Sequence, residues 1–257
     1  MPFNLVCPSS RGLSLALSRV LLRTTPYPLI ATARSDHSAV KERILSGLDG
    51  VPASRVTVLH VDVTDEDTIS SAASFAHAQF PDDHLQYVFS TAGILHPERS
   101  TSDLSAEDVK ATLETNVLGP LLVLKHFSSL LPTRSSPGGE GQHPISVWAN
   151  VSARVGSIGD NKLGGWYSYR ASKAALNSVT KSLDIEVERK SGDRAIAVAM
   201  HPGTVKTDLS REFWGSVPEG KLFSPEDAAE KVVGVVRGLG VEQRGGFWDW
   251  KGVEVEW

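Results

Sequence analysis

Short apolar runs alternate with amphipathic runs along almost the whole chain, and this alternation restricts the fold more than any other feature. We expect strands at 3–7, 28–33, 55–63, 85–93, 144–152, 195–203 and 246–250. Helices are expected at 13–22, 37–48, 66–80, 106–131, around Tyr169 and at 224–237. Continuously apolar strands separated by helices indicate a parallel sheet that is covered on both faces. The sequence therefore predicts an α/β fold, a single Rossmann-like doubly wound domain over 1–257 with helices on both faces.

Composition supports one large domain and excludes several classes of function. The chain has 257 residues, of which 40% are hydrophobic, and a formal net charge of −4, which is not the basic footprint of a nucleic-acid binder. Cys7 is the only cysteine and the eight histidines are scattered, so neither a disulfide framework nor a metal site is expected. No apolar run reaches the roughly 18 residues of a membrane span. We expect a cytoplasmic protein that binds neither nucleic acid nor membrane.

The N-terminal segment allows two interpretations. It contains Arg11, Arg19, Arg23 and Arg34 and no acidic residue before Asp36, a composition typical of mitochondrial transit peptides. The same residues also fit a strand, turn, helix and strand, which would form the first unit of the fold. We favour the structural interpretation over targeting. The Pro-, Gly- and Ser-rich stretch at 132–144 is interpreted as a loop between a helix and a strand.

The stretch "GGWYSYRASKAALN" places two tyrosines two residues apart, with a lysine four residues beyond the second. In a helix with about 100° between residues, Tyr169 and Lys173 share a face while Tyr167 points nearly the opposite way. A lysine ammonium beside a phenol favours the phenolate and lowers the phenol pKa, which suits proton transfer. Tyr169 is the acid/base candidate, and Tyr167 is interpreted as a packing or pocket-wall residue.

Several motifs occur in an order that is similar to one known family. "YRASK" resembles a Tyr-x-x-x-Lys motif, "STAG" at 90–93 an Asn-Asn-Ala-Gly turn, "ETNVLG" a helix asparagine at Asn116, and "HPGTVKT" a Pro-Gly-x-x-x-Thr segment. Together they resemble the short-chain dehydrogenase/reductase family over essentially the whole chain. The region around "YRASK" and the compact C-terminus are most similar to the branch of C-factor and the sniffer-type carbonyl reductases.

The resemblance implies an oxidoreductase that uses a nicotinamide cofactor to reduce a small ketone, aldehyde or enone. Tyr169 would protonate the carbonyl oxygen, and Lys173 would lower the Tyr169 pKa and bind the nicotinamide ribose. The implied catalytic residues are Asn116, Ser152, Tyr169 and Lys173, and the implied assembly is a homodimer or homotetramer.

Asn116 has support from the residues themselves. Pro120 lacks the N–H that would bond the Asn116 carbonyl four residues back, so a distortion is expected within the helix at 106–131. In the family such a distortion leaves this carbonyl free for a water in the proton relay. The alternative is that Gly119-Pro120 ends or kinks the helix only for packing.

Arg34 follows the second strand, where an acidic residue would bind the ribose of NAD and a basic one the 2′-phosphate of NADP. With Arg11 nearby, the sequence favours NADPH, and NAD is the less favoured cofactor. Asp62 resembles the start of an adenine-contacting pair, although it would serve equally as a helix cap. The expected cofactor-binding residues are Ser9, Ser10, Arg11, Gly12, Leu13, Arg34, Asp62, Val63, Ala92, Gly93, Tyr169, Lys173, Pro202, Gly203, Val205 and Thr207.

The chain also departs from the family pattern. In the loop "CPSSRGLS" only Gly12 remains of three glycines, with Pro8 and Ser14 in place of the others, which removes close-approach room near a pyrophosphate. Ala153 stands where the carbonyl-orienting serine is expected, leaving Ser152 one residue early and Ser157 as another candidate. These departures keep a second hypothesis open, a catalytically weak or inactive protein of reductase fold that senses cofactor or acts as a scaffold. The sequence does not identify the substrate.

Overall fold

The computed structural model describes residues 1–136 and 144–257 and contains a seven-stranded parallel sheet in the order β3-β2-β1-β4-β5-β6-β9. The doubly wound prediction is confirmed. A separate parallel pair, β7 and β8, lies beyond β6. The loop expected at 132–144 lies partly outside the described residues. The strands are β1 Phe3–Cys7, β2 Leu29–Ala33, β3 Val56–His60, β4 Leu85–Ser90, β5 Ser146–Val151, β6 Ala195–His201, β7 Thr204–Val205, β8 Leu222–Phe223 and β9 Phe247–Asp249.

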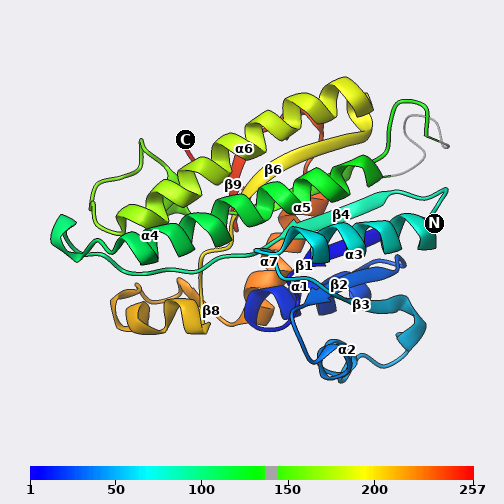
Figure 1. The fold of residues 1–257 in the computed structure, drawn as a ribbon, viewed down its shortest axis with the longest axis horizontal. Coiled ribbons are helices and arrows are strands. Elements are labelled where there is room, and N and C mark those ends of the chain that lie inside the picture. Colours follow the sequence, from blue (N-terminus) through cyan, green and yellow to red (C-terminus); the bar gives the residue numbers. More distant parts are fainter. Residues whose placement is uncertain (137–143) are drawn as a thin grey trace.

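Helices cover both faces of the sheet, α1, α2 and α7 on one side and α3 to α6 on the other (Figure 1). The first layer packs Leu17 and Val232 against the sheet, and the second packs Ile69, Phe127 and Leu183. Apolar strand residues face both layers, as expected for a sheet buried on each side. The helices are α1 Gly12–Thr24, α2 His37–Leu45, α3 Glu66–Gln79, α4 Ala106–Leu113, α5 Gly119–Phe127, α6 Tyr167–Ser191 and α7 Pro225–Gly238.

Side-chain caps fix where several of these helices begin. Ser105 accepts from the Asp108 amide at 3.3 Å, and Ser224 accepts from the Asp227 amide at 3.0 Å. Each cap satisfies an amide that has no partner inside its helix. The helices expected from residues 106 and 224 therefore begin at residues whose side chains cap them.

The helix expected at 106–131 is not continuous. A π-helical turn, Glu114–Leu118, separates α4 from α5, and the Gly119 amide donates to the Glu114 carbonyl five residues back. Pro120 follows at the second position of α5, where a missing N–H is tolerated. The distortion predicted around Asn116 is confirmed, and it takes the form of a π-turn.

The first 34 residues form β1, α1 and β2 of the sheet, as the structural interpretation of this segment predicted. Within the described residues, no helix combines the length and apolar character needed to cross a membrane. The same residues contain no grouping of three or more His, Cys, Asp or Glu side chains suited to a metal ion.

Candidate active site

A cavity of about 1200 Å³ opens beyond the carboxyl ends of the strands. This is where doubly wound sheets bind their ligands. Tyr169, Lys173 and Ser152 line it, as do all the predicted cofactor-binding residues except Ser9. Asn116 lies behind the wall, although its neighbour Thr115 lines the cavity. Chain segments far apart in sequence thus meet at one site.

Tyr169 and Lys173 share the buried face of α6, as the helical spacing predicted, whereas Tyr167 is 42% exposed. The Lys173 Nζ lies 5.7 Å from the centre of the Tyr169 ring and donates to the Val151 carbonyl at 2.9 Å. Burial lowers the pKa of Lys173 to about 8. Burial also raises the pKa of Tyr169 above its usual range, so the phenol stays protonated in the protein without cofactor. The lowering expected from Lys173 is not present in this state, because desolvation dominates.

Asn116 joins the π-turn to the loop after β4. Its Oδ1 accepts from the Ile94 amide at 2.8 Å, and its Nδ2 donates to the Ile94 carbonyl at 2.9 Å and to Ser172 Oγ at 3.0 Å. A Cβ on Gly93 would lie 3.4 Å from Lys173 Nζ and 3.7 Å from Asn116 Oδ1. Asn116 therefore positions the Gly93 turn beside the Tyr169–Lys173 pair.

The hydroxyls of both serine candidates are engaged in hydrogen bonds within the protein. Ser152 donates to Asn177 Oδ1 at 2.6 Å and lies 3.5 Å from the Lys173 carbonyl oxygen. Ser157 accepts from the Asp160 amide at 3.0 Å and is buried. Ser152 and Ala153 both line the cavity, and Ala153 brings no hydroxyl to it. The carbonyl-orienting role of a serine stays a prediction.

The loop between β1 and α1 forms an anion site with its backbone. Arg11 is the residue before α1, and no side chain caps this helix. The first-turn amides are therefore available to a phosphate. Gly12 has φ +54°, and a Cβ there would lie 3.0 Å from Thr207 Cγ2, so glycine is required.

Ser9 and Ser14, by contrast, are engaged inside the fold. Ser9 is fully buried, its hydroxyl donates to the Val6 carbonyl at 2.7 Å, and its amide donates to Thr32. The prediction that Ser9 contacts the cofactor is therefore not supported. Ser14 Oγ lies 2.8 Å from Thr91 Oγ1, which also bonds the Pro8 carbonyl. Ser14, which stands in place of a family glycine, is thus hydrogen-bonded to the turn after β4.

The end of the cavity beyond β2 is mostly basic. Arg34 and Arg43 line it, and the acidic residues Asp36 and Asp62 also lie there. Asp62 accepts from the Thr64 amide at 3.0 Å, and the pKa of its carboxyl is lowered by this bond and by the charge of Arg34, against the effect of burial. The guanidinium groups of Arg34 and Arg43 fit a phosphate better than a neutral ribose edge.

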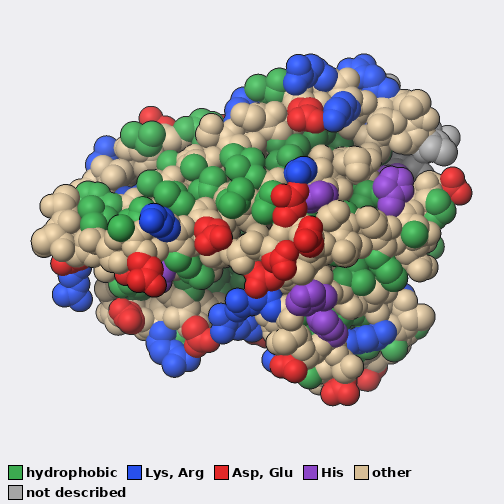
Figure 2. Space-filling model, viewed as in Figure 1, with side chains coloured by type: hydrophobic (Ala, Val, Ile, Leu, Met, Phe, Trp, Pro, Cys, Tyr) green, Lys and Arg blue, Asp and Glu red, His purple; other side chains and the backbone are tan. Residues whose placement is uncertain are grey.

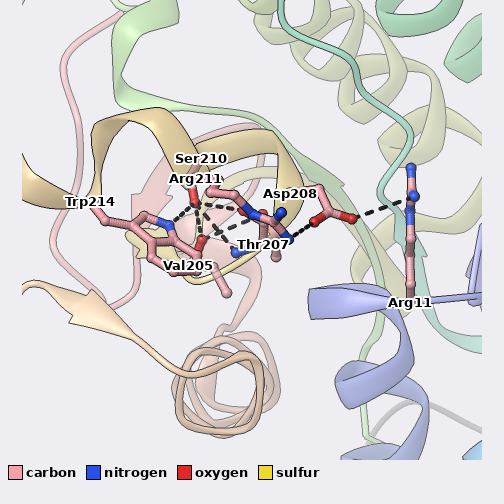
Figure 3. A network of polar contacts seen from close by, with 7 residues as sticks. All are labelled: Arg11, Val205, Thr207, Asp208, Ser210, Arg211 and Trp214. Carbon is pink, nitrogen blue, oxygen red and sulfur yellow. Dashed lines mark hydrogen bonds and ion pairs between the residues drawn. The ribbon is translucent and has the colours of Figure 1, made fainter.

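A segment with 3-10 geometry, Asp208–Ser216, forms the opposite rim of the cavity. Asp208 lies 2.5 Å from Arg211 and 3.7 Å from Arg11, so it links this rim to the start of α1 (Figure 3). Ser210 donates to the Val205 carbonyl and accepts from Trp214 Nε1 at 2.9 Å. These bonds tie the rim to β7 and orient Phe213 toward Trp166, 4.6 Å away between ring centres.

Two cavity residues, Trp166 and His201, were not singled out from the sequence. Trp166 stands 6.2 Å from the Tyr169 ring and, with Phe213, forms an aromatic wall. His201 ends β6, and burial together with the charge of Arg154 lowers its pKa to about 4. Among the described residues its Nδ1 has no hydrogen-bond partner. His201 directly precedes the noted Pro202-Gly203, so its place at the end of a strand was the available signal.

Comparisons with known proteins agree with this geometry. The model of the short chain dehydrogenase family matches residues 4–216. The chain belongs to the short-chain dehydrogenase family. The recognition from the ordered motifs is thereby confirmed.

Proteins from several organisms resemble the chain. It is 31% identical over 214 residues to the 1-hydroxy-2-glutathionyl-2-methyl-3-butene dehydrogenase of Rhodococcus sp. (strain AD45), covering 83% of this chain and 86% of the relative. It is 34% identical over 173 residues to C-signal of Myxococcus xanthus, covering 67% of this chain and 93% of the relative. The solved structure of carbonyl reductase Sniffer of D. melanogaster has a TM-score of 0.84 and 28% identity over the full length of both chains.

Proposed function

We propose that the protein reduces a small carbonyl compound with NADPH, with Tyr169 as the general acid. The observation that carries the proposal is the buried, protonated phenol of Tyr169 at the cavity wall, with the Lys173 ammonium beside it. Burying a lysine ammonium beside a tyrosine hydroxyl lowers the free energy of unfolding. Ionisable groups with shifted pKa values of this kind cluster at functional sites.

The residues fit a nicotinamide dinucleotide. The uncapped amides at the start of α1 and the guanidinium of Arg11 suit a pyrophosphate, and Arg34 and Arg43 suit a 2′-phosphate. Gly93 and Gly203 line the other end of the cavity. Gly203 is required there by packing, since a Cβ would lie 2.7 Å from Phe223 Cε2. NADPH, when bound, supplies the hydride.

The protein's own residues handle the proton. The Tyr169 O–H donates its proton to the substrate oxygen, leaving a phenolate. The Lys173 ammonium, held by the Val151 carbonyl, stabilises that phenolate through its charge. Asn116 keeps the Gly93 turn and Ser172 in place around the pair. Ala153 offers no hydroxyl to the carbonyl, so orientation depends on shape more than in a protein with the usual serine.

A flat, apolar carbonyl compound fits this site best. Trp166 and Phe213 present ring surfaces next to Tyr169. Sniffer is named a carbonyl reductase, and the Rhodococcus relative is named a dehydrogenase of a hydroxy compound, which is the same chemistry in the opposite direction. Both names support hydride exchange between a carbonyl and an alcohol.

The second candidate is a cofactor-binding scaffold with little or no turnover. Ala153 and the Ser14–Thr91 contact in the phosphate loop favour it, and the relative C-signal carries no enzyme name. For either candidate we propose a cytoplasmic homodimer or homotetramer.

Titration of NADPH, followed by a panel of aldehydes, aryl ketones and enones, separates the two candidates. Loss of nicotinamide absorbance that depends on Tyr169 supports the reductase. NADPH binding with no turnover across the panel supports the scaffold. Absence of NADPH binding contradicts both.

A further inference from the structure

The helix that carries Tyr169 and Lys173 begins in an unusual way. Gly164 and Gly165 have φ of +65° and +64°, and Trp166, the residue before α6, has φ 51° and ψ 44°. A tryptophan seldom adopts this left-handed conformation, and such outliers persist only where surrounding contacts hold them. Trp166 provides no side-chain cap, and the first turn of α6 contains no acidic residue. Something outside the helix must therefore satisfy its first amides.

Glu98, from the loop after β4, supplies this cap across the fold. Its main-chain carbonyl accepts from the Trp166 amide at 2.6 Å, and its carboxylate accepts from the Ser168 amide at 3.4 Å and from the Ser168 hydroxyl. Its side chain is nearly completely buried, and no Lys or Arg among the described residues pairs with it. A buried carboxylate without a cation is tolerated here because the positive end of a helix faces it.

The approach of Glu98 is close enough to require glycine beside it. A Cβ on Gly165 would lie 3.2 Å from the Glu98 carbonyl oxygen. On the other side, Arg170 donates to the Gly165 carbonyl at 2.9 Å and to the Val155 carbonyl at 3.1 Å. The turn before α6 is thus held from two sides, by Glu98 and by Arg170.

The parts of the site that this turn fixes are those that would meet the substrate. Trp166 and Tyr169 line the cavity on either side of Ser168, the residue that Glu98 binds through both main chain and side chain. Their rings are 6.2 Å apart, and Phe213 closes on Trp166 from the opposite rim. Rotation of the first turn of α6 would move the phenol and the aromatic wall together.

We propose that Glu98 is a positioning residue, which fixes the Trp166 ring and the Tyr169 phenol relative to the bound carbonyl compound. This inference rests on the proposed reductase function. Glu98 does not line the cavity, so it acts on a bound ligand only through Trp166 and Ser168. The phosphate end of the cavity, built from α1 and Arg34, is independent of it.

The test compares Glu98→Ala, Glu98→Gln and Ser168→Ala with the wild type. Glu98→Ala is expected to lower kcat/KM for an aryl ketone about tenfold or more, since small misplacements of positioned groups are costly. NADPH affinity is expected to stay within about twofold, as its phosphates are held elsewhere. Glu98→Gln retains one acceptor oxygen for Ser168 and has an NH2 group that can donate to the Ser168 hydroxyl, so it is expected to recover most of the activity. Hydrogen exchange at the first turn of α6 is expected to accelerate in Glu98→Ala but not in Glu98→Gln.

Asp103→Asn is the matched control. Asp103 accepts from the Arg99 and Ser100 amides at 2.9 Å in the same loop, and no hydrogen bond joins it to α6 within the described residues. Its replacement is expected to leave kcat/KM and exchange at α6 unchanged. If Glu98→Ala fails to fold, Ser168→Ala decides, with a smaller loss in the same direction expected.

Unchanged kcat/KM in Glu98→Ala, or an equal loss of NADPH affinity, would overturn the proposal. Unchanged kcat/KM would show that Glu98 does not fix the positions of Trp166 and Tyr169. An equal loss of NADPH affinity would indicate general destabilisation of the protein. Wild-type protein that turns over no carbonyl compound contradicts the proposed function instead. In that case exchange at α6, which needs no turnover, still decides the role of Glu98.

Discussion

The Ser152 hydroxyl donates to Asn177 Oδ1 at 2.6 Å and so belongs to the packing of β5 against α6. Ser152→Ala is therefore expected to lower the free energy of unfolding by about 1 kcal/mol, the typical value of a hydrogen bond. Turnover should change by less than about threefold, because the hydroxyl is already engaged by Asn177 and by the Lys173 carbonyl. Urea unfolding and steady-state kinetics measure the two effects. A large loss of kcat at unchanged stability would return Ser152 to the catalytic residues.

Ala153→Ser is the complementary change. It places a hydroxyl at the cavity wall, where Ala153 now contributes only a methyl group. We expect kcat/KM for carbonyl compounds to rise by about tenfold, as expected when an oriented donor is added at a reacting oxygen. The initial rate of NADPH oxidation is the readout. A fall in rate with correct folding would show that the wall has no room for the hydroxyl.

Tyr169→Phe and Tyr167→Phe separate the two tyrosines of α6. Loss of the Tyr169 hydroxyl removes the proton donor and should lower kcat by about 10²-fold or more, with NADPH binding retained. Tyr167 is 42% exposed and outside the cavity lining, so its replacement should be nearly neutral. Single-turnover kinetics and NADPH titration of both variants test this. Similar losses in the two variants would contradict the assignment.

Burial of Lys173 predicts that the free energy of unfolding of the cofactor-free protein depends on pH. Its pKa falls from 10.5 to about 8 on folding, so the folded protein binds fewer protons than the unfolded chain between these values. The destabilisation, about 3 kcal/mol by this shift, is present in full below pH ~8 and vanishes as pH rises toward ~10.5. The stability difference between Lys173→Met and wild type should therefore shrink over this range. Denaturant unfolding at several pH values measures it, and a difference that grows with pH would contradict the prediction.

Arg34→Asp should shift cofactor preference from NADPH toward NADH. The substitution replaces a phosphate partner at the basic end of the cavity with an acceptor for ribose hydroxyls. Binding constants for both cofactors, measured at two salt concentrations, give the preference and its electrostatic part. Arg19→Ala, on a guanidinium outside the cavity lining that bonds the Arg43 and Ile44 carbonyls, is the control for lost positive charge. Wild-type preference for NADH would contradict the NADPH proposal.

An apolar surface over α4, α5 and α6 is the candidate for self-association (Figure 2). Leu113, Leu118, Leu121 and Ile185 each expose about two fifths of their surface or more. Leu118→Asp should convert a dimer or tetramer into a smaller species with little change in monomer stability, since the side chain is already exposed. Light scattering after size exclusion measures the mass. Monomeric wild-type protein would contradict the oligomer prediction.

The order of the elements was predictable because a buried parallel sheet imposes apolar strands at regular intervals. Each of β1 to β6 lies within or next to a predicted range, and Ser105 and Ser224 marked the starts of α4 and α7. Boundaries were less predictable. The strand expected at 55–63 ends at His60, because the following residues turn toward α3 and bond Thr64 and Thr68.

The site was predictable where one residue type is needed at one position. Tyr169 and Lys173 share a face of α6 as their spacing predicted, and Arg34 lines the basic end. Asn116, which the family resemblance implied, bonds Ser172 on the same helix. Glu98 was not predictable, because an isolated glutamate in a loop carries no local pattern, and its partner lies 70 residues away. The inward turn of Ser9 depends on its contacts with Val6 and Thr32, which no local motif encodes.

The π-turn at Glu114–Leu118 has a consequence for the whole helical layer. A π-turn is a helix with one residue more than α-geometry needs, so the segments on either side differ in rotational phase by about 100°. α4 packs against α6, while α5 packs against α3. Because of the added residue, the apolar face of α4 points toward α6 and that of α5 points toward α3. Deletion of a single residue there would restore a continuous α-helix. The apolar face of either α4 or α5 would then point toward solvent.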